Sequence, residues 1–310
     1  MGKNIRYCLL TNDVETTSIW HNDLRDSTGF KVYREGMPLL LEIYRKYNVK
    51  STFYFTGYIA KLIPDIVKMV LKDGHEVGSH GLRHEKEFGF DVMSLESQIE
   101  HLNQSKKILE DIISDEVISF RAPALRTNKK TVKALLETGF KIDSSVASQR
   151  FDMFFSFGAL KKLNWLLSPR LPYITSINNI FKSGNDGIVE VPLSATGLPY
   201  LGTTMRIFPT ITSLQRRLLN FENSFNQKPI VFDIHPNEMI DESNEKRKIN
   251  RRSKNLFSYF IQDYMRSKLK SKNLGKDALL LYEKEINFFS NRNYKFTTIK
   301  DYCLQNKLIT

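Results

Sequence analysis

The most constraining feature of the sequence is a repeated alternation between short apolar runs and amphipathic stretches. The runs typical of strands cover residues 6–11, 51–56, 75–79, 117–121 and 141–145. The stretches with helical spacing between them cover residues 39–47, 64–71, 94–113 and 128–137. Strands that alternate with helices in this way predict a parallel sheet with helices outside, as in a doubly wound sheet or a (β/α) barrel.

Polar side chains follow the carboxyl ends of the predicted strands. In a parallel barrel these ends share one rim, where active sites lie, so several polar clusters favour the barrel over the open sheet. The clusters are at Asp13, His80, Arg121, Asp143 and His235, the last after a run at 230–234. A helical stretch at 279–289 and a last strand and helix within 294–304 are expected to close the barrel. We expect residues 1–310 to form a single α/β domain.

Length and composition exclude several classes of protein. With 310 residues, of which 41% are hydrophobic, the chain can bury a sizeable core and is not globally disordered. Only Cys8 and Cys303 are present, too few for a disulfide framework. Residues 1–7 carry basic groups but no apolar stretch typical of a signal peptide. We therefore expect a cytoplasmic protein.

The chain is strongly basic, with a formal net charge of +12. Residues 244–276 contain eleven Lys or Arg and two acids. Residues 151–182 interleave aromatic and apolar side chains with cations and have no acid after Asp152. Both segments favour contact with an anionic membrane surface. The alternatives are a solvated basic helix for the first and an insertion packed on the barrel for the second; nucleic-acid binding is disfavoured because no nucleic-acid motif accompanies the basic residues.

Two histidines and two carboxylates form a candidate metal site. His80 and His84 are four residues apart, so in a helical turn they would project from one face toward a divalent metal. Gly81 stands where a zinc protease of the H-E-x-x-H type carries its glutamate, which excludes that class. Asp13 and Glu15 offer a third ligand and a general base. Carboxylates in a solvated turn at the strand end are the alternative.

The motifs, in their order, resemble the NodB-homology polysaccharide deacetylases, carbohydrate esterase family 4. The resemblance covers roughly residues 5–240 and implies a hydrolase with a distorted, seven-stranded (β/α) barrel. The sequence departs from the family pattern at Leu125, where a glycine is usual, and lacks the tryptophan of the fourth motif. The matching motifs are NDVE at 12–15, SHGLRH at 79–84, FRAP at 120–123, IDSS at 142–145 and FDIH at 232–235.

The resemblance implies a role for each motif residue. Glu15, His80 and His84 would bind a divalent metal, zinc first, with cobalt, nickel, manganese or iron as alternatives. Asp13 would then be the general base, although the swapped assignment, with Asp13 on the metal, stays open. The remaining implied roles are His235 as the acid that protonates the leaving amine, Arg121 as the group that orients Asp13, Asp143 as a group that tunes Arg121 or His235, and Pro123 as a substrate-binding residue. Arg206 is a further candidate substrate-binding residue, because it follows the loop after the sixth strand and could contact a phosphate.

The substrate implied is an amino sugar that carries an N-acetyl or N-formyl group. Residues 36–55 and 189–193 resemble a branch whose familiar member deformylates formamidoarabinose linked to undecaprenyl phosphate. A lipid-linked substrate would place the protein on the inner face of the plasma membrane. The alternatives are a deacetylase of soluble or polymeric N-acetylglucosamine saccharides and a non-catalytic protein that binds sugar or nucleic acid.

Overall fold

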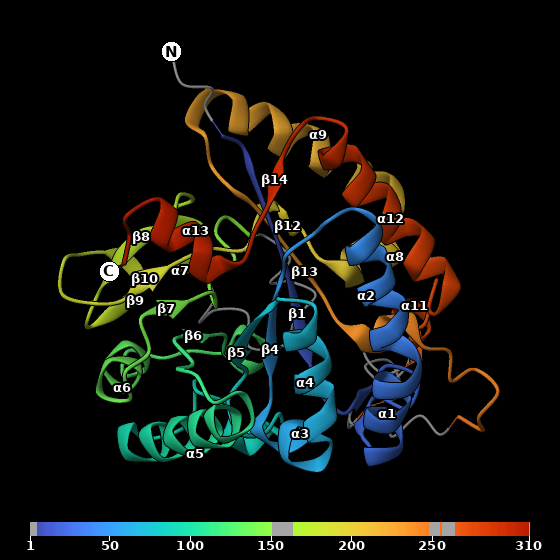
Figure 1. Cartoon of the computed structure of the whole chain (residues 1–310), viewed down its shortest axis with the longest axis horizontal. Helices are drawn as coiled ribbons and strands as arrows, with labels where there is room; N and C mark the ends of the chain where they lie inside the picture. The colour runs from blue at the N-terminus through green and yellow to red at the C-terminus, as the bar shows by residue number, and fades with distance from the viewer. Residues whose placement is uncertain (1–4, 151–163, 248–254, 256–263, 310) are drawn as a thin grey trace.

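Seven parallel strands form the centre of the molecule in the computed structural model, which describes residues 5–150, 164–247, 255 and 264–309 (Figure 1). Each strand of the series pairs in parallel with the next. In spatial order they are β13 (Ile230–Ile234), β1 (Tyr7–Val14), β4 (Thr52–Phe55), β5 (Glu76–Ser79), β6 (Ser119–Phe120), β7 (Ile142–Asp143) and β10 (Val189–Glu190). The series confirms the predicted order of elements.

The two ends of the series meet, which makes the sheet a distorted (β/α) barrel. The backbone N–H of Ser194, just beyond β10, donates to the carbonyl of Val231 in β13 at 3.0 Å. The prediction that the last strand closes the barrel is wrong. That strand, β14 (Lys295–Phe296), pairs with Tyr7 and Cys8 instead. It fits there because β1 is long and β4 pairs with it only from Thr11 onward.

Helices cover the outside of the barrel and begin where the local sequence allows. Ser94 caps α5 (Leu95–Ile113) by accepting a hydrogen bond from the backbone N–H of Ser97. Pro64 opens α4 (Pro64–Lys72), where its missing N–H costs nothing. The helix expected from residue 39 begins earlier, at Asp26. It runs as α1 (Asp26–Lys31), a π-helical stretch η1 (Val32–Gly36) and α2 (Met37–Lys46).

The remaining elements flank the barrel or cross its rim. The helices are α3 (Gly57–Leu62), α6 (Thr131–Glu137), α7 (Asn164–Leu167), α8 (Gly202–Ile207), α9 (Pro209–Asn226), α11 (Arg266–Lys270), α12 (Lys276–Ser290) and α13 (Ile299–Gln305). Short strands are β2 (Thr17–Ser18), β3 (Asp23–Leu24), β8 (Tyr173–Ser176), β9 (Asn179–Ser183), β11 (Ala195–Thr196) and β12 (Leu198–Pro199); 3-10 turns are η2 (Lys86–Phe88), η3 (Pro123–Leu125) and η6 (Pro236–Met239).

Two apolar layers hold the barrel together. The larger lies between sheet and helices and includes the fully buried rings of Tyr44, Phe53 and Phe232. The smaller involves side chains from the other face of the strands, among them Leu9 and Tyr54. All eight residues of β1 are buried, as expected of a strand covered on both faces. Among the helices of the described ranges, none is long and apolar enough to cross a bilayer.

The two segments predicted to meet a membrane are only partly described. Residues 151–163 and most of 248–263 lie outside the described ranges. Within residues 164–182, Trp165 is only 2% exposed and lies under the guanidinium of Arg150, 5.0 Å from its ring centre. The ring of Trp165 therefore belongs to the core, whereas Leu167 in the same segment is 90% exposed, and membrane contact by this segment stays a prediction.

Candidate active site

The loop after β5 carries both predicted histidine ligands. His80 follows the strand directly, and Gly81 turns the chain with a φ of +70°. The backbone N–H groups of Gly57 and Tyr58 donate to the carbonyls of Gly81 and Leu82, which ties the loop to the start of α3. The ring centres of His80 and His84 lie 5.7 Å apart. The two rings thus meet without the helical turn that their spacing suggested.

His80 is held in a form that can bind a metal. Its Nδ1 lies 2.9 Å from the carbonyl oxygen of Arg121, which can only accept, so Nδ1 carries the proton and Nε2 keeps its lone pair. Nε2 is buried and makes no hydrogen bond. Burial also holds the pKa of His80 well below its usual range. The imidazole is therefore neutral, with a free donor atom facing the site.

Glu15 brings an anionic ligand to the same place. Its Oε2 lies 3.1 Å from Nε2 of His84, is buried, and makes no hydrogen bond. One donor atom each from Glu15, His80 and His84 lies within 4.8 Å of the others. Burial alone would raise the pKa of Glu15, but His84, His235 and His80 lower it, so the group is ionised. Two imidazoles and one carboxylate whose ligand atoms lie this close together fit a divalent transition metal.

Asp13 lies between the three candidate ligands and the barrel interior. Its Oδ1 accepts a hydrogen bond from Nη1 of Arg121 at 3.0 Å. Its Oδ2 lies 3.7 Å from Nε2 of His80 and 3.9 Å from Nε2 of His235. One carboxylate oxygen is thus fixed by a cation while the other faces the space between two histidines.

Arg121 is the fixed cation of the barrel interior. It is completely buried, and its Nη1 donates to Asp13, to Asp233 at 2.6 Å and to Thr11 at 2.8 Å. Nε and Nη2 donate to the carbonyl and hydroxyl oxygens of Ser144, both at 2.9 Å. Burial alone would lower the pKa of Arg121, but Asp13 and Asp233 raise it. The guanidinium therefore stays charged and cannot rotate away.

Asp233 is a site residue for which the sequence predicted no role. It lies two residues before His235 on β13, and its Oδ2 lies 3.8 Å from Nδ1 of His235. Burial and the nearby Asp13 raise its pKa to about 6. Burial alone would lower the pKa of His235, but Asp233, Asp13 and Glu15 together raise it by more, so the net shift of this pKa is upward. The alternation of a strand, which places 233 and 235 on one face, is the signal that could have revealed this residue.

Asp143 lies deeper and has different partners from those expected. Its Oδ1 accepts a hydrogen bond from the hydroxyl of Ser145 at 2.6 Å. It pairs across β7 and β10 with Glu190, and burial raises the pKa of both carboxyls. The direct contacts with Arg121 and His235 are made by Asp233, and the role of Asp143 in tuning either group stays a prediction.

The two predicted substrate-binding residues differ in placement. Arg206 is 1% exposed, and its Nη1 donates to the carbonyls of Lys270 and Lys272, both at 2.7 Å. The prediction that Arg206 contacts substrate is therefore corrected: its guanidinium joins α8 to the end of α11. Pro123 is buried and packs beside the histidine loop, because a Cβ on Gly81 would lie 3.4 Å from its Cγ. Substrate contact by Pro123 stays a prediction.

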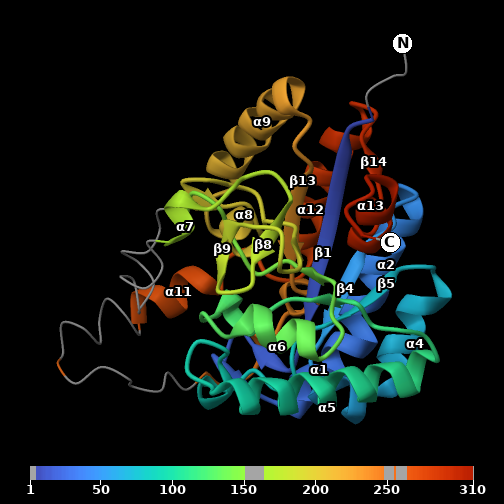
Figure 2. The ribbon, with the colours of Figure 1, turned by 90° about the vertical axis from the view of Figure 1, so that its left-hand side faces the viewer.

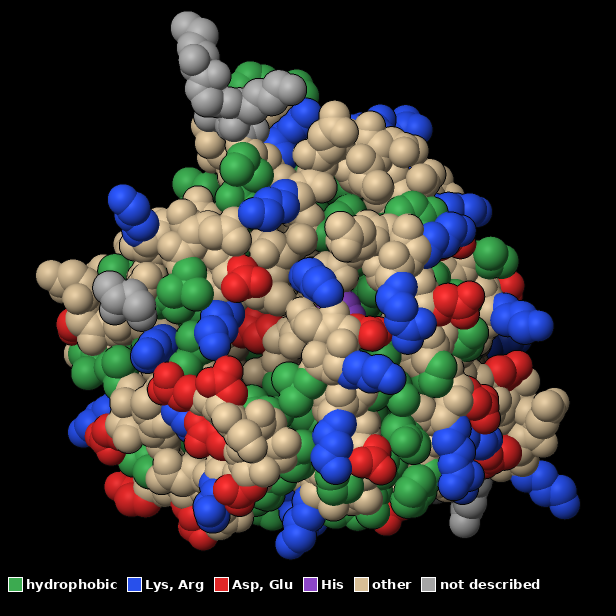
Figure 3. All heavy atoms as spheres, viewed as in Figure 1, with side chains coloured by type: hydrophobic (Ala, Val, Ile, Leu, Met, Phe, Trp, Pro, Cys, Tyr) green, Lys and Arg blue, Asp and Glu red, His purple; other side chains and the backbone are tan. Residues whose placement is uncertain are grey.

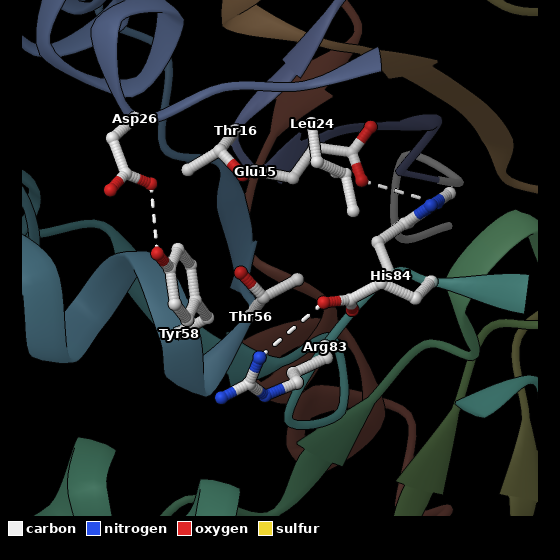
Figure 4. Close-up of a pocket in the computed structure, with 9 residues that line it drawn as sticks. Glu15, Thr16, Leu24, Asp26, Thr56, Tyr58, Arg83 and His84 are labelled. Atoms are coloured by element: carbon white, nitrogen blue, oxygen red, sulfur yellow. Dashed lines mark hydrogen bonds and ion pairs between the residues drawn. The ribbon is translucent and has the colours of Figure 1, made fainter. Parts of the chain in front are cut away.

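A polar pocket of about 190 Å³ adjoins Glu15 and His84 (Figure 4). On its far side the hydroxyl of Tyr58 donates to Asp26 at 2.8 Å, and Arg83 lies over the Tyr58 ring. Such a mixture of hydroxyl, carboxylate and guanidinium groups around one aromatic ring suits a hydroxylated ligand. The other lining residues are Thr16, Leu24, Thr56 and Glu85.

Comparisons with known proteins point to polysaccharide deacetylases. Residues 26–142 match the family model for polysaccharide deacetylase. The chain is 28% identical over 129 residues to a peptidoglycan deacetylase of Helicobacter pylori, which covers 42% of this chain and 43% of that protein. It is 31% identical over 104 residues to a peptidoglycan-N-acetylglucosamine deacetylase of Bacillus cereus, covering 34% and 47%. The chain thus spans less than half the length of these two relatives.

Two further matches cover a larger share of the matched protein. A candidate 4-deoxy-4-formamido-L-arabinose-phosphoundecaprenol deformylase of Wigglesworthia glossinidia brevipalpis is 28% identical over 205 residues, covering 50% of this chain and 71% of that protein. A candidate polysaccharide deacetylase structure from Mycobacterium smegmatis has a TM-score of 0.63 at 18% identity, covering 100% of this chain and 94% of the other. This structural likeness shows the fold, and the fold agrees with the expected distorted barrel.

Proposed function

The chain belongs to the polysaccharide deacetylase family, and from this premise we propose that it is a hydrolase that removes an N-acyl group from an amino sugar with the help of a divalent metal. One observation carries the proposal. Glu15 and His80 bring buried atoms without a hydrogen bond together with Nε2 of His84, next to Asp13, whose second oxygen has no hydrogen bond to Arg121. A ligand set and a base side by side are what amide hydrolysis by activated water needs.

The metal would be held by Glu15, His80 and His84. Two nitrogen ligands and one oxygen ligand suit zinc, and cobalt, nickel, manganese and iron have related preferences. When bound, the metal would act as a Lewis acid, which lowers the pKa of water and polarises the acyl carbonyl. The carbonyl of Arg121 contributes indirectly, since its contact with Nδ1 orients His80.

Asp13 is the base in this proposal. Its Oδ2 faces His80 and His235 and takes the proton of the attacking water, while Arg121 holds Oδ1 by a hydrogen bond. Because Arg121 is itself fixed by Asp233, Thr11 and Ser144, Asp13 has little freedom to turn. A preoriented base avoids a reorganisation cost during the reaction.

His235 is the acid in this proposal. Asp233, Asp13 and Glu15 raise the pKa of His235, which favours the protonated imidazole, and its Nε2 lies 3.9 Å from Oδ2 of Asp13. A proton from His235 would let the amine leave as the carbon–nitrogen bond breaks. Asp233 supports the imidazolium from the Nδ1 side.

The substrate class is an N-acyl amino sugar. Relatives named for peptidoglycan and for N-acetylglucosamine support an N-acetyl group. The relative named for a formamidoarabinose linked to phosphoundecaprenol is matched over a larger share of its length and supports an N-formyl, lipid-linked substrate as a second candidate. With such a substrate the protein would act at the cytoplasmic face of a membrane, and its basic chain would favour anionic lipid.

Replacement of each carboxylate in turn tests which one binds the metal and which one is the base. We expect Glu15→Gln to lose bound zinc, measured by equilibrium dialysis and elemental analysis, because a neutral amide is a poor zinc ligand. Asp13→Asn is expected to keep its zinc but to lose about 10²–10⁴-fold in kcat for acyl release, because it removes the base. The control is Glu85→Gln, which changes a carboxylate in the pocket but not at the proposed ligand site. Loss of zinc in Asp13→Asn and retention in Glu15→Gln would support the swapped assignment.

A further inference from the structure

Helix α9 carries an apolar stripe on its solvent side. Its five members are spaced by three, four, three and four residues, and their side chains are 42–74% exposed. The opposite side of the helix is buried against the barrel through Thr212, Gln215, Leu219 and Asn223. The stripe is therefore no part of the core. Its members are Ile211, Leu214, Leu218, Phe221 and Phe225.

The stripe is large for a surface that stays in water. With apolar side chains of about 150–250 Å² each, roughly half exposed, it presents on the order of 500 Å². Soluble monomers rarely expose contiguous apolar patches of more than a few hundred Å². Stable protein interfaces cover about 800 Å² per partner, which the stripe approaches before its polar margins are counted. In both ribbon views α9 lies at the outer edge of the molecule (Figures 1 and 2), where a partner could reach it.

The spacing of the stripe specifies a helix as its partner. A repeat of three and four residues is the seam of a coiled-coil pair, in which each side chain fits between four side chains of the facing helix. A helix that lies on a bilayer shares this spacing but is rich in Lys and Arg on its polar face, whereas the charged residues of α9 are Arg216, Arg217 and Glu222. Within the described ranges, no other helix presents more than one large apolar side chain exposed to this degree. A second copy of α9 offers a seam of the same spacing.

We propose that the protein is a homodimer in which α9 packs antiparallel against α9 of a second copy across a two-fold axis near Leu218. The aromatic end of the stripe, where Phe221 and Phe225 make an edge-to-face pair at 4.7 Å, then faces the aliphatic end with Ile211 and Leu214. In antiparallel packing the two helix dipoles also point in opposite directions, which is electrostatically favourable. A two-fold contact of identical surfaces closes on itself and gives a dimer and not a filament.

Charge at the margin of the stripe does not oppose the contact. Glu222 is paired with Arg170 at 2.6 Å and with Lys228 at 3.2 Å, so this acid is already satisfied within one copy. Arg216 is paired with Glu285 at 2.8 Å. Arg217 is exposed and lies next to Leu218, at the rim of the interface, where it stays in water.

Sedimentation equilibrium of the full chain tests the proposal. The wild type is expected to dimerise, and Leu218→Glu to weaken the dimer by at least about 100-fold, since it places a charge on each side of the two-fold axis. The matched control is Leu304→Glu on α13, because Leu304 is 42% exposed and Leu218 47%; it should dimerise like the wild type. A wild type that is monomeric at about 100 µM, or a Leu218→Glu variant with wild-type affinity, would overturn the proposal.

Cross-linking tests the direction of packing. Leu218→Cys should form a disulfide-linked dimer under oxidation because its copies meet near the axis, whereas Ile211→Cys should not, since its copies lie at opposite ends. The native thiols Cys8 and Cys303 are buried and do not compete. Cross-linking by Ile211→Cys would overturn the antiparallel arrangement. A wild type that is monomeric in solution but binds vesicles of anionic lipid through Leu218 would overturn the dimer in favour of a lipid contact.

Discussion

A buried arginine between two aspartates organises the site at the scale of single residues. Arg121 contacts Asp13 and Asp233 through one nitrogen, and each aspartate faces His235 with its other oxygen. The sequence predicted Arg121, Asp13 and His235 from their motifs. It could not predict Asp233 as their common partner, because that contact joins β6 to β13 and depends on the register of the barrel.

Replacement of Asp233 by asparagine is expected to change the pH dependence of acyl release. His235 acts in its protonated form, and Asp233 raises its pKa. Without that carboxylate the pKa of His235 falls, so the alkaline limb of the kcat/KM profile moves to lower pH. Asp143→Asn is the control, because Asp143 bonds to Ser145 and not to His235, and should leave the limb in place. A shift in Asp143→Asn and none in Asp233→Asn would restore the role first expected for Asp143.

At the scale of single elements, the conformation of the loop after β5 depends on one glycine and on contacts with the start of a helix. The histidine loop turns at Gly81 with a φ of +70°, and a Cβ there would lie 3.2 Å from the Phe90 ring. The spacing of His80 and His84 suggested a helical turn, but the chain leaves β5 in an irregular loop because its carbonyls accept from the start of α3. That contact has no signature in the local sequence.

Gly81→Ala is expected to weaken both stability and metal binding. A left-handed φ costs a residue with a Cβ about 1–2 kcal/mol, and relief of the contact with Phe90 would move the histidines. Gly74→Ala is a matched control, because Gly74 has a φ of +71° but only the flexible end of Lys50 nearby. Both variants should lose similar free energy of unfolding in urea, and only Gly81→Ala should bind zinc more weakly. Equal zinc affinity in the two would show that the loop does not position the ligands.

Glu222→Gln tests the ion pairs that join α9 to its surroundings. Arg170 and Lys228 lower the pKa of Glu222 to about 2 against the opposing effect of burial. A carboxyl with a lowered pKa stabilises the fold above its unfolded value of about 4.5, and this contribution is lost as pH falls toward 2. We expect the variant to lose about 1–2 kcal/mol in the free energy of unfolding at pH 7, after allowance for solvent screening, and the difference to narrow below pH 4. Glu283→Gln, in an exposed pair with Lys46, should match the wild type.

At the scale of the whole molecule, the alternation of strands and helices was enough to predict a parallel barrel with one functional rim. It did not predict which segments close the barrel, because the contact between Ser194 and Val231 joins distant parts of the chain that carry no motif for it. Charge was informative in a different way. Lys and Arg on the face shown in Figure 3 are scattered among acids and apolar groups. Most of the net charge of +12 comes from residues 244–276, which contain eleven Lys or Arg and two acids.

The net positive charge predicts salt-dependent attraction to anionic lipid. We expect binding to vesicles with anionic headgroups to exceed binding to neutral vesicles and to weaken as salt rises from 0.1 to 1 M, where the screening length falls from about 10 to 3 Å. Co-sedimentation measures both. Equal binding to the two kinds of vesicle would remove the support that charge gives to a membrane-bound substrate.

The release of acetate or formate from N-acyl amino sugars, followed by proton NMR, tests the central claim most directly. The account predicts that zinc-loaded protein releases the acid from at least one N-acetylated saccharide or N-formylated lipid-linked sugar, that chelation abolishes the release, and that Asp13→Asn slows it by about 10²-fold or more. No release from any such substrate by the zinc-loaded protein, or undiminished release by Asp13→Asn, would contradict it.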